Sequence, residues 1–387
     1  MRGPWLARPL RELEDVVEDV RVVQPDWGRR ELRQRRRDRA ARASGASGAD
    51  ALEGDEEGNT EVICGTWVGH AGAFVEIPLR APSSTSRSSS STGASSTLKV
   101  LFDPIFSARA SPVTWFGPKR MREAPCSVED LPGVDIVAIS HNHYDHLDLA
   151  TILAVRAKWP RARYFVGLGN KPWFLARGIS ARQVFEMDWW DEVTLPASVF
   201  LDGDTGYRPI ASSPLTSPVF SALGRSHGPF DLSFIPIWRG GTLGFISALG
   251  LRLCQENLPT ATHASPSDAV QIHLDARSRN TVGIHFGTFQ GSHLEALEAL
   301  HALEMACDEA GVRDLGDAKE GKRGQMGRLD IGETLVVEGA SFIISLAGSG
   351  RELTGRTQCS RRRWRSRVSR AERPALQASH KLPSLEY

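Results

Sequence analysis

The sequence predicts an α/β domain in which two β-sheets pack on each other and helices cover their outer faces. Short apolar runs alternate with helix-like segments from about Glu61 to Val337, and mixed elements in this order suit two sheets with helices outside them. Hydrophobic residues make up 41% of the 387 residues, so the chain can bury a sizeable core. Histidines cluster directly after one apolar run, at the end of a predicted strand, which is where α/β proteins usually form their sites.

Both ends of the chain and one insertion are expected to lie outside this domain, which we place at 61–340. Residues 1–60 are charged and poor in aromatic residues, and such segments are usually disordered or marginally helical. A basic arm, from Arg33 to Arg42, that touches an anionic membrane is the alternative. The Ser-rich stretch 81–97 predicts a flexible insertion in a hairpin, and the basic segment 341–387 predicts a disordered tail.

The elements of the domain follow in order. The run from Val134 to Ser140 is short and apolar, which suits a strand buried on both faces. Leu149 to Trp159 is a predicted helix that ends at Pro160. A capping serine, a proline and an acid at 265–268 open a helix that runs to about 276. The other expected strands are 62–64, 74–77, 98–102, 164–167, 184–187, 199–201, 232–237, 281–286 and 329–337, and a helix capped at 292 runs through 310.

Composition limits the classes of protein that the chain can belong to. A formal net charge of +1 argues against a nucleic-acid footprint over the whole chain. No run of 18 apolar residues occurs, so no transmembrane helix is expected, and the N-terminus lacks the apolar core of a secretory signal. The five cysteines are scattered without a Cys-x-x-Cys pair, which fits a reduced compartment. We therefore expect a cytoplasmic protein, with its oligomeric state left open.

A cluster of metal-binding residue types follows the predicted strand at 134–140. Three of the eleven histidines lie within 141–146, together with an aspartate. Residues two apart in an extended segment face the same way, so His141 and His143 can converge on one metal. A turn after Tyr144 would aim Asp145 and His146 at a second point about 3.5–4 Å away, the spacing of two-metal hydrolytic sites. Imidazole and carboxylate suit zinc, with iron or manganese as alternatives, and surface histidines on a loop are the weaker reading.

Two further residues have a suitable context but no strong signal of their own. Asp204 follows an apolar strand, and its carboxylate could bridge two cations, although a lone Asp-Thr-Gly is more often a turn. His285 ends another predicted strand, where a histidine is more often a satisfied core residue than a ligand.

The segment 141–146 resembles the His-x-His-x-Asp-His signature of the metallo-β-lactamase superfamily. The chain is more closely similar to one branch, the N-acylphosphatidylethanolamine-hydrolysing phospholipase D family, over roughly Glu61 to Val337. The segments that carry this resemblance are 65–71, 102–107, 109–112, 116–120, 139–148, 188–192, 203–207 and 284–289.

The resemblance implies an αββα sandwich and two zinc ions. It implies hydrolysis of the phosphodiester of an N-acylated phospholipid at a peripheral membrane surface, with an N-acylethanolamine and phosphatidic acid as products. One zinc would be held by His141 and His143, and the other by Asp145, His146 and His285, with Asp204 as the bridge. A hydroxide shared by the metals, held through Asp145 and Asp204, would attack phosphorus, so no serine or cysteine nucleophile is needed.

Other residues receive supporting roles. Asp103 and Asp148 are candidates to orient the ligating imidazoles, with simple turn or cap roles as the alternative. His263 matches a family histidine near the substrate. Trp238 opens the glycine-punctuated stretch 238–253, whose roughly 16 residues could lie in a membrane interface or form a buried helix or loop.

The chain departs from the family after Leu195. There the family has several tens of residues, including a Pro-x-x-His-Trp segment whose histidine is the third ligand of the first zinc. Here 196–201 lead directly to Gly203 and Asp204, and His227 is not a convincing substitute. We therefore expect about one tightly bound zinc and poor hydrolysis. A lost exon in the deduced sequence or a genuinely impaired enzyme would explain the missing segment equally well. A hydrolase of another phosphodiester, ester or lactone and a non-catalytic metal-binding remnant stay as alternatives.

Overall fold

A computed structural model of the chain describes residues 6–7, 17–44, 62–79, 97–191, 199–210, 212–238, 251–253, 263–289, 293–315, 317 and 323–338. The chain divides into two units, Met1–Ser349 and Gly350–Tyr387, and the described residues all belong to the first. The tail at 341–387, most of the insertion at 81–97 and residues 196–198, where the resemblance breaks off after Leu195, lie outside the described residues. Within the described ranges, every helix is too short or too polar to cross a bilayer.

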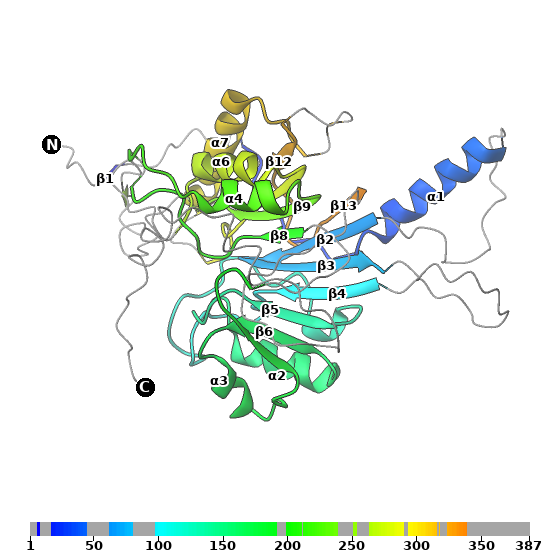
Figure 1. The fold of residues 1–387 in the computed structure, drawn as a ribbon, viewed down its shortest axis with the longest axis vertical. Coiled ribbons are helices and arrows are strands. Elements are labelled where there is room, and N and C mark those ends of the chain that lie inside the picture. The colour runs from blue at the N-terminus through cyan, green and yellow to red at the C-terminus, as the bar shows by residue number, and fades with distance from the viewer. Residues whose placement is uncertain are drawn as a thin grey trace. The chain divides into compact units, whose positions relative to one another are not determined.

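The larger sheet has seven strands and carries the predicted strand at 134–140 in its interior (Figure 1). Its first four strands pair antiparallel, and its last four pair parallel. Their order is β13 (Thr334–Glu338), β2 (Val62–Gly69), β3 (Gly72–Pro78), β4 (Thr97–Phe102), β5 (Ile136–Ile139), β6 (Arg163–Gly167) and β7 (Val184–Met187).

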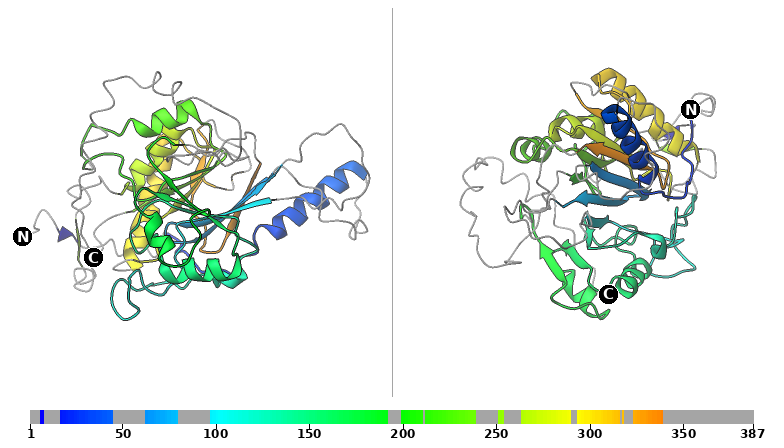
Figure 2. Two further views of the ribbon diagram at one scale, coloured as in Figure 1. Left: turned by 60° about the horizontal axis from the view of Figure 1, so that its bottom comes forward. Right: turned by 90° about the vertical axis from the view of Figure 1, so that its right-hand side faces the viewer.

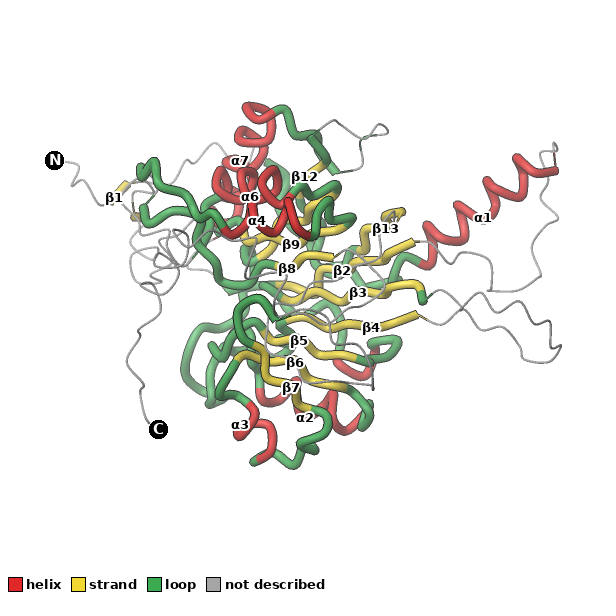
Figure 3. The backbone as a smooth tube through the Cα atoms, in the orientation of Figure 1, coloured by secondary structure: helices red, strands yellow, loops and turns green. Residues whose placement is uncertain are grey.

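The smaller sheet has four parallel strands, in the order β12 (Gln325–Gly327), β11 (Asn280–Ile284), β9 (Leu232–Pro236) and β8 (Val199–Leu201). A separate antiparallel pair joins β1 (Leu6–Ala7) to β10 (Arg252–Leu253). Long loops gather at the end where β4 to β7 finish (Figure 3). Since the carboxyl ends of parallel strands meet at one edge, residues that follow different strands can converge there.

Helices cover the outer faces of both sheets, as Figure 1 and the two views of Figure 2 show. The helix α2 (Leu149–Lys158) and the short α3 (Lys171–Leu175) lie against the larger sheet, and α4 (Val219–Ser226), α6 (Pro266–Ala276) and α7 (His293–Ala310) lie against the smaller one. A short 3₁₀ helix, η2 (Val128–Asp130), packs beside α2. The predicted capping residue Ser265 is confirmed, because its side chain accepts a hydrogen bond from Asp268 N at 3.2 Å.

Alternation along the strands explains the layers. In β4, Val100 and Phe102 enter the core that also holds residues of the smaller sheet, whereas Leu101 faces the cluster that includes α2. The same period of two separates Ala138 from Val137 in β5. An apolar run buried on both faces is therefore the expected form of such a strand. The predicted α/β class, with two sheets and flanking helices, is confirmed.

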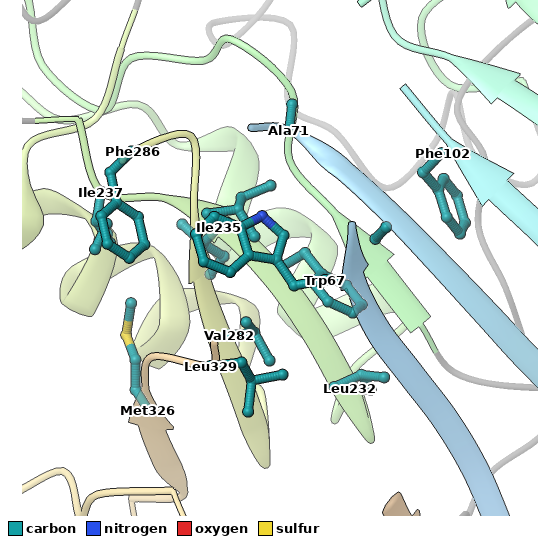
Figure 4. Close-up of a cluster of buried hydrophobic side chains, with 14 of the residues drawn as sticks. Trp67, Ala71, Phe102, Leu232, Ile235, Ile237, Val282, Phe286, Met326 and Leu329 are labelled. Carbon is teal, nitrogen blue, oxygen red and sulfur yellow. The ribbon is translucent and has the colours of Figure 1, made fainter. Parts of the chain in front are cut away.

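The core between the sheets is shown in Figure 4. Trp67 stacks on Phe286, with ring centroids 5.0 Å apart and planes 18° from parallel, and neither ring is exposed. The Trp67 indole donates to the carbonyl of His70 at 2.9 Å. This contact between the sheets thus fixes the turn that joins β2 to β3.

The predicted strand at 329–337 is wrong in its first half. β12 ends at Gly327 and β13 begins at Thr334, and a turn lies between them in which Glu333 N donates to Asp330 O at 2.9 Å. Ile331 is buried, but it pairs with Val22 from the N-terminal segment. The apolar pattern thus indicates correctly that Ile331 is buried, but it does not indicate that Val22 is its partner.

The N-terminal segment is also more ordered than its charge indicated. Val17, Val20 and Trp27 are buried in the domain core. The helix α1 (Arg29–Ser44) follows and runs outward from the sheet end near β13, where Arg35 donates to Val336 O at 3.0 Å (Figures 1 and 2). The expectation of a mostly disordered arm over 1–60 is therefore wrong for 17–44, because three buried apolar side chains outweigh the charged composition.

Candidate metal centre

The histidine motif lies between the end of β5 and the start of α2. Ile139 ends the strand, and His146 N and Leu147 N both donate to His143 O, at 3.0 and 2.8 Å, which closes a turn. Asp148 then caps α2. A strand end on one side and a capped helix on the other hold the motif, so its side chains project from rigid supports.

Asp204, three residues after β8, is the centre of the cluster. Its Oδ1 atom faces His146 Nε2 at 3.0 Å and His285 Nε2 at 2.8 Å. Both imidazoles are buried. His285 follows β11 with a left-handed backbone (φ 64°), and its amide donates to His70 O at 2.9 Å. The smaller sheet thereby delivers His285 to the motif on the larger one.

The Oδ2 atom of Asp204 faces a different set of imidazoles. His263 Nε2 lies 3.0 Å away, His141 Nε2 3.5 Å and His143 Nδ1 3.9 Å. The nitrogens of His141 and His143 are themselves 2.8 Å apart, as the alternation of an extended segment predicts. The two oxygens of one carboxylate thus face different imidazole nitrogens.

Asp145 lies beside the Oδ1 group. Its Oδ2 atom is 3.6 Å from His146 Nε2 and 4.0 Å from His285 Nε2. The strongest contact of Asp145 is with a residue that the sequence analysis did not assign to the site, because His70 Nε2 lies 2.8 Å from the same oxygen. The predicted convergence of Asp145, His146, Asp204 and His285 is therefore what the structure has, and their role as ligands stays a prediction.

Three overlapping groups among the described residues could each hold a metal ion. They are His70, Asp145, His146 and His285; His141, His143 and Asp204; and Asp204, His263 and His285, with the ligand atoms of each group within 4.8 Å of one another. Two ligands of one tetrahedral zinc lie about 3.3 Å apart when each bond is about 2.0–2.1 Å. Most of the distances around Asp204 and Asp145 are close to that value, so the donor set fits a cation.

Unsatisfied polar atoms support the same conclusion. His146 Nε2, His285 Nε2 and Asp204 Oδ1 are buried, and they converge without a hydrogen-bond geometry that would satisfy them. Buried polar atoms in native proteins nearly always have a partner, and a bound ion is one explanation of an exception. A cation between these three atoms would satisfy all of them at once.

The electrostatics favour a positive charge at this point. Burial would raise the pKa values of Asp145 and Asp204, but the neighbouring histidines outweigh it and hold both pKa values below their usual range. Burial would lower the pKa of His146, but Asp103 and Asp204 outweigh it and hold the pKa well above the ordinary value. The carboxylates therefore attract positive charge, which a metal can supply instead of imidazole protons.

Asp103 and Asp148, the two carboxylates predicted to orient the imidazoles, have different roles in the structure. Asp103 is fully buried and accepts hydrogen bonds from His146 Nδ1 at 2.9 Å and from Ser140 N at 2.7 Å, which leaves His146 Nε2 to face the cluster. Asp148 instead bonds Ser107 and Thr151 and caps α2. The role predicted for Asp148 is therefore wrong, and the alternative of a helix cap is correct.

His70 is the site residue that sequence reasoning missed. It sits at the turn between β2 and β3 with a left-handed backbone (φ 53°), is buried, and has a pKa that burial and His285 lower to about 3. Thr288 Oγ1 accepts a hydrogen bond from its amide at 2.7 Å. The only available signal was its place in the family-like segment 65–71, because Asp145 lies 75 residues away along the chain.

Trp238 and His263 lie together. Their ring centroids are 4.7 Å apart with planes 34° from parallel, so Trp238 covers one face of the imidazole. His227 ends α4 as its C-cap. Residues 239–250, the main part of the stretch considered as a membrane contact, lie outside the described residues.

Comparison with known protein families supports these features. A model of the β-lactamase superfamily domain matches residues 99–215. N-acyl-phosphatidylethanolamine-hydrolyzing phospholipase D 1 of Caenorhabditis elegans is 29% identical over 265 residues, which cover 58% of this chain and 64% of that protein. The mitochondrial N-acyl-phosphatidylethanolamine-hydrolyzing phospholipase D of Saccharomyces cerevisiae is 26% identical over 249 residues, which cover 56% of this chain and 50% of that protein. The chain thus spans less than two thirds of the length of these relatives.

Solved structures of metallo-hydrolases are also similar at low sequence identity. Igni18, a metallo hydrolase of Ignicoccus hospitalis, is 14% identical, covers 72% of this chain and 99% of its own, and has a TM-score of 0.43. An isothiocyanate hydrolase from Delia radicum gut bacteria is 14% identical, covers 73% of this chain and 100% of its own, and has a TM-score of 0.42.

Proposed function

We propose that this chain, which carries a β-lactamase superfamily domain and is related to the N-acyl-phosphatidylethanolamine-hydrolyzing phospholipases D, is a zinc-dependent phosphodiester hydrolase of phospholipid. Its substrate would be N-acylphosphatidylethanolamine, and its products an N-acylethanolamine and phosphatidic acid. The observation that carries the proposal is Asp204, whose two oxygens face different imidazole nitrogens. A carboxylate in this position can bridge two cations.

Bound metals would supply an activated water at neutral pH and offset negative charge on the phosphoryl oxygens. The residues of the chain would hold these metals and keep the ligand atoms in the required protonation states. Asp145 and Asp204 stay ionised, and Asp103 holds the proton of His146 on Nδ1 so that Nε2 stays available. The described cysteines do not offer a competing nucleophile, because burial raises the thiol pKa values of Cys64, Cys126 and Cys307 to about 12.

A loop with aromatic residues supports a lipid substrate. Trp115 and Phe116 are 77% and 68% exposed, and the exposed Lys119 lies beside them in the chain. The base of this loop is joined to the segment that follows His285, because Met121 N donates to Thr288 O at 2.9 Å. Exposed aromatic and basic side chains together are suited to the surface of a phospholipid membrane. We propose that the protein acts there as a peripheral enzyme of the cytoplasm.

The test is hydrolysis of defined substrates by the full chain. Zinc-loaded protein would be mixed with vesicles of N-acylphosphatidylethanolamine, and both products measured by mass spectrometry. We expect both products from the wild type and from His227→Asn, and neither from Asp204→Asn. An ester or lactone hydrolysed in place of the phospholipid would refute the substrate, and no hydrolysis of any of these by metal-loaded protein would identify a non-catalytic remnant.

A further inference from the structure

The imidazole of His70 lies within the cluster, but its distance from Asp145 differs from that of the other histidines. His70 Nε2 is 2.8 Å from Asp145 Oδ2. His146 Nε2 and His285 Nε2 lie farther from the same oxygen, at 3.6 and 4.0 Å. A hydrogen bond to an ionised acceptor is about 2.7–2.9 Å long, and two ligands of one tetrahedral zinc are about 3.3 Å apart. The contact of His70 therefore has the length of a hydrogen bond, and the other two have the spacing of atoms that share a cation.

The proton of this hydrogen bond belongs to His70. A carboxylate that binds a metal is deprotonated, so Asp145 can only accept. The nitrogen that faces it, Nε2, then carries a proton and has no lone pair for a metal. His70, Asp145, His146 and His285 have ligand atoms within 4.8 Å of one another, but only the last three of them would then bind the ion. One more coordination position stays open for water, as a catalytic zinc requires.

The fold holds the ring of His70 in place. The residue is 4% exposed, and its ring lies 4.0 Å from that of His285 and stands nearly perpendicular to that of Phe289. Its backbone is fixed separately, because the amide donates to Thr288 Oγ1 at 2.7 Å and the carbonyl accepts from His285 N at 2.9 Å. A substitution that keeps this backbone would therefore remove the contact with Asp145 without releasing the amide of His285.

We propose that His70 is a positioning residue, which donates a hydrogen bond from Nε2 to Asp145 and holds that carboxylate toward the metal. The inference rests on the proposed zinc hydrolase. Asp145 is 27% exposed in its side chain, compared with 0% for His146 and 5% for His285. Packing thus restrains Asp145 least of these three residues, so a hydrogen bond from a buried ring is what orients its carboxylate before the metal binds.

The test uses two amide side chains that differ by one carbon atom. The amide nitrogen of glutamine can take the position of an imidazole Nε2, so His70→Gln keeps the donor. His70→Asn is too short to place a donor there, although asparagine tolerates the left-handed backbone of residue 70 (φ 53°) better than glutamine does. A role in the turn alone therefore favours His70→Asn, and a role at Asp145 favours His70→Gln. His227→Asn, at the end of α4, is the control for the loss of an imidazole.

The zinc dissociation constant of each full chain would be measured by competition with a chromophoric chelator, and the thermal stability of each metal-free chain by calorimetry. We expect His70→Gln and His227→Asn to bind zinc as tightly as the wild type. We expect His70→Asn to bind it about 10–100-fold more weakly, the usual cost of losing the hydrogen-bond partner of a ligand. Equal zinc affinities in the two variants of His70 would overturn the proposal. A loss confined to His70→Asn but matched by lower stability of that metal-free chain would also overturn it, and would assign His70 to the turn.

The wild type gives a second readout that does not depend on the folding of any variant. In the zinc-loaded chain, long-range ¹H–¹⁵N NMR distinguishes a protonated ring nitrogen from one that binds metal. We expect a protonated Nε2 in His70, and zinc bound to that nitrogen would contradict the proposal. Neither readout uses a lipid, so a failure of the proposed phospholipase activity would be seen separately.

Discussion

If the protein is the proposed zinc hydrolase, replacing Asp103 with asparagine should weaken zinc binding although Asp103 does not face the proposed metal positions. Both carboxylate oxygens accept from donors, Oδ1 from Ser140 N at 2.7 Å and Oδ2 from His146 Nδ1 at 2.9 Å. The NH₂ group of an asparagine would meet one of these donors whichever way it is oriented. If it meets His146, the imidazole proton must move to Nε2, the atom that lies 3.0 Å from Asp204 Oδ1.

The size of the expected loss in zinc affinity follows from the role of Asp103 as the hydrogen-bond partner of His146. Removing the hydrogen-bond partner of a metal-binding histidine typically costs 10–100-fold in metal affinity, or about 1.4–2.7 kcal/mol. Asp103 and His146 are both fully buried, so water cannot take the place of the lost acceptor. We expect a dissociation constant for the more tightly bound zinc that is higher by about 10–100-fold in Asp103→Asn than in the wild type.

Competition with a chromophoric zinc chelator measures this constant directly. Asp148→Asn is the matched control, because Asp148 caps α2 through Thr151 and Ser107, and asparagine is an equally good cap. Its zinc affinity should equal that of the wild type. Wild-type affinity in Asp103→Asn, or an equal loss in both variants, would refute the reasoning that assigns the orienting role to Asp103 alone.

Three further outcomes are expected. Asp148→Ala should lower the free energy of unfolding by about 1 kcal/mol through loss of the α2 cap, as chemical denaturation would show, and leave zinc affinity unchanged. The double variant Trp115→Ser, Phe116→Ser should bind anionic vesicles at least about tenfold more weakly in a sedimentation assay, since burying one such side chain contributes roughly 1.5–3 kcal/mol. Burial lowers the pKa of His273 in the folded protein below its value in the unfolded chain. As the pH falls through the unfolded value, the unfolded chain therefore takes up more protons than the folded one, and the free energy of unfolding decreases. His273→Gln, whose amide can still reach Thr281, should therefore lose less thermal stability than the wild type between pH 7 and pH 5.

Local signals in the sequence were sufficient for the motif and most strands. Val199–Leu201 is an apolar run with polar residues at its ends and has the predicted bounds, as does Val184–Met187, which lies between Gln183 and Asp188. Local signals did not show which distant segments meet. Ile331 was read as part of a strand because its burial by Val22 cannot be seen from its neighbours. His70 was missed for the same reason, since its partner Asp145 comes from another part of the larger sheet.

The histidine motif follows a strand of the larger sheet, whereas Asp204 and His285 follow strands of the smaller one. A cation held by all of them would therefore be a cross-link between two layers that also meet through apolar packing such as Trp67 on Phe286. Binding energy and folding energy are then coupled, because ligands that belong to separated layers cannot bind one ion. A cavity made in this packing, far from any ligand, would be measured as a rise in the zinc dissociation constant, and zinc in the medium would restore the thermal stability lost to the cavity.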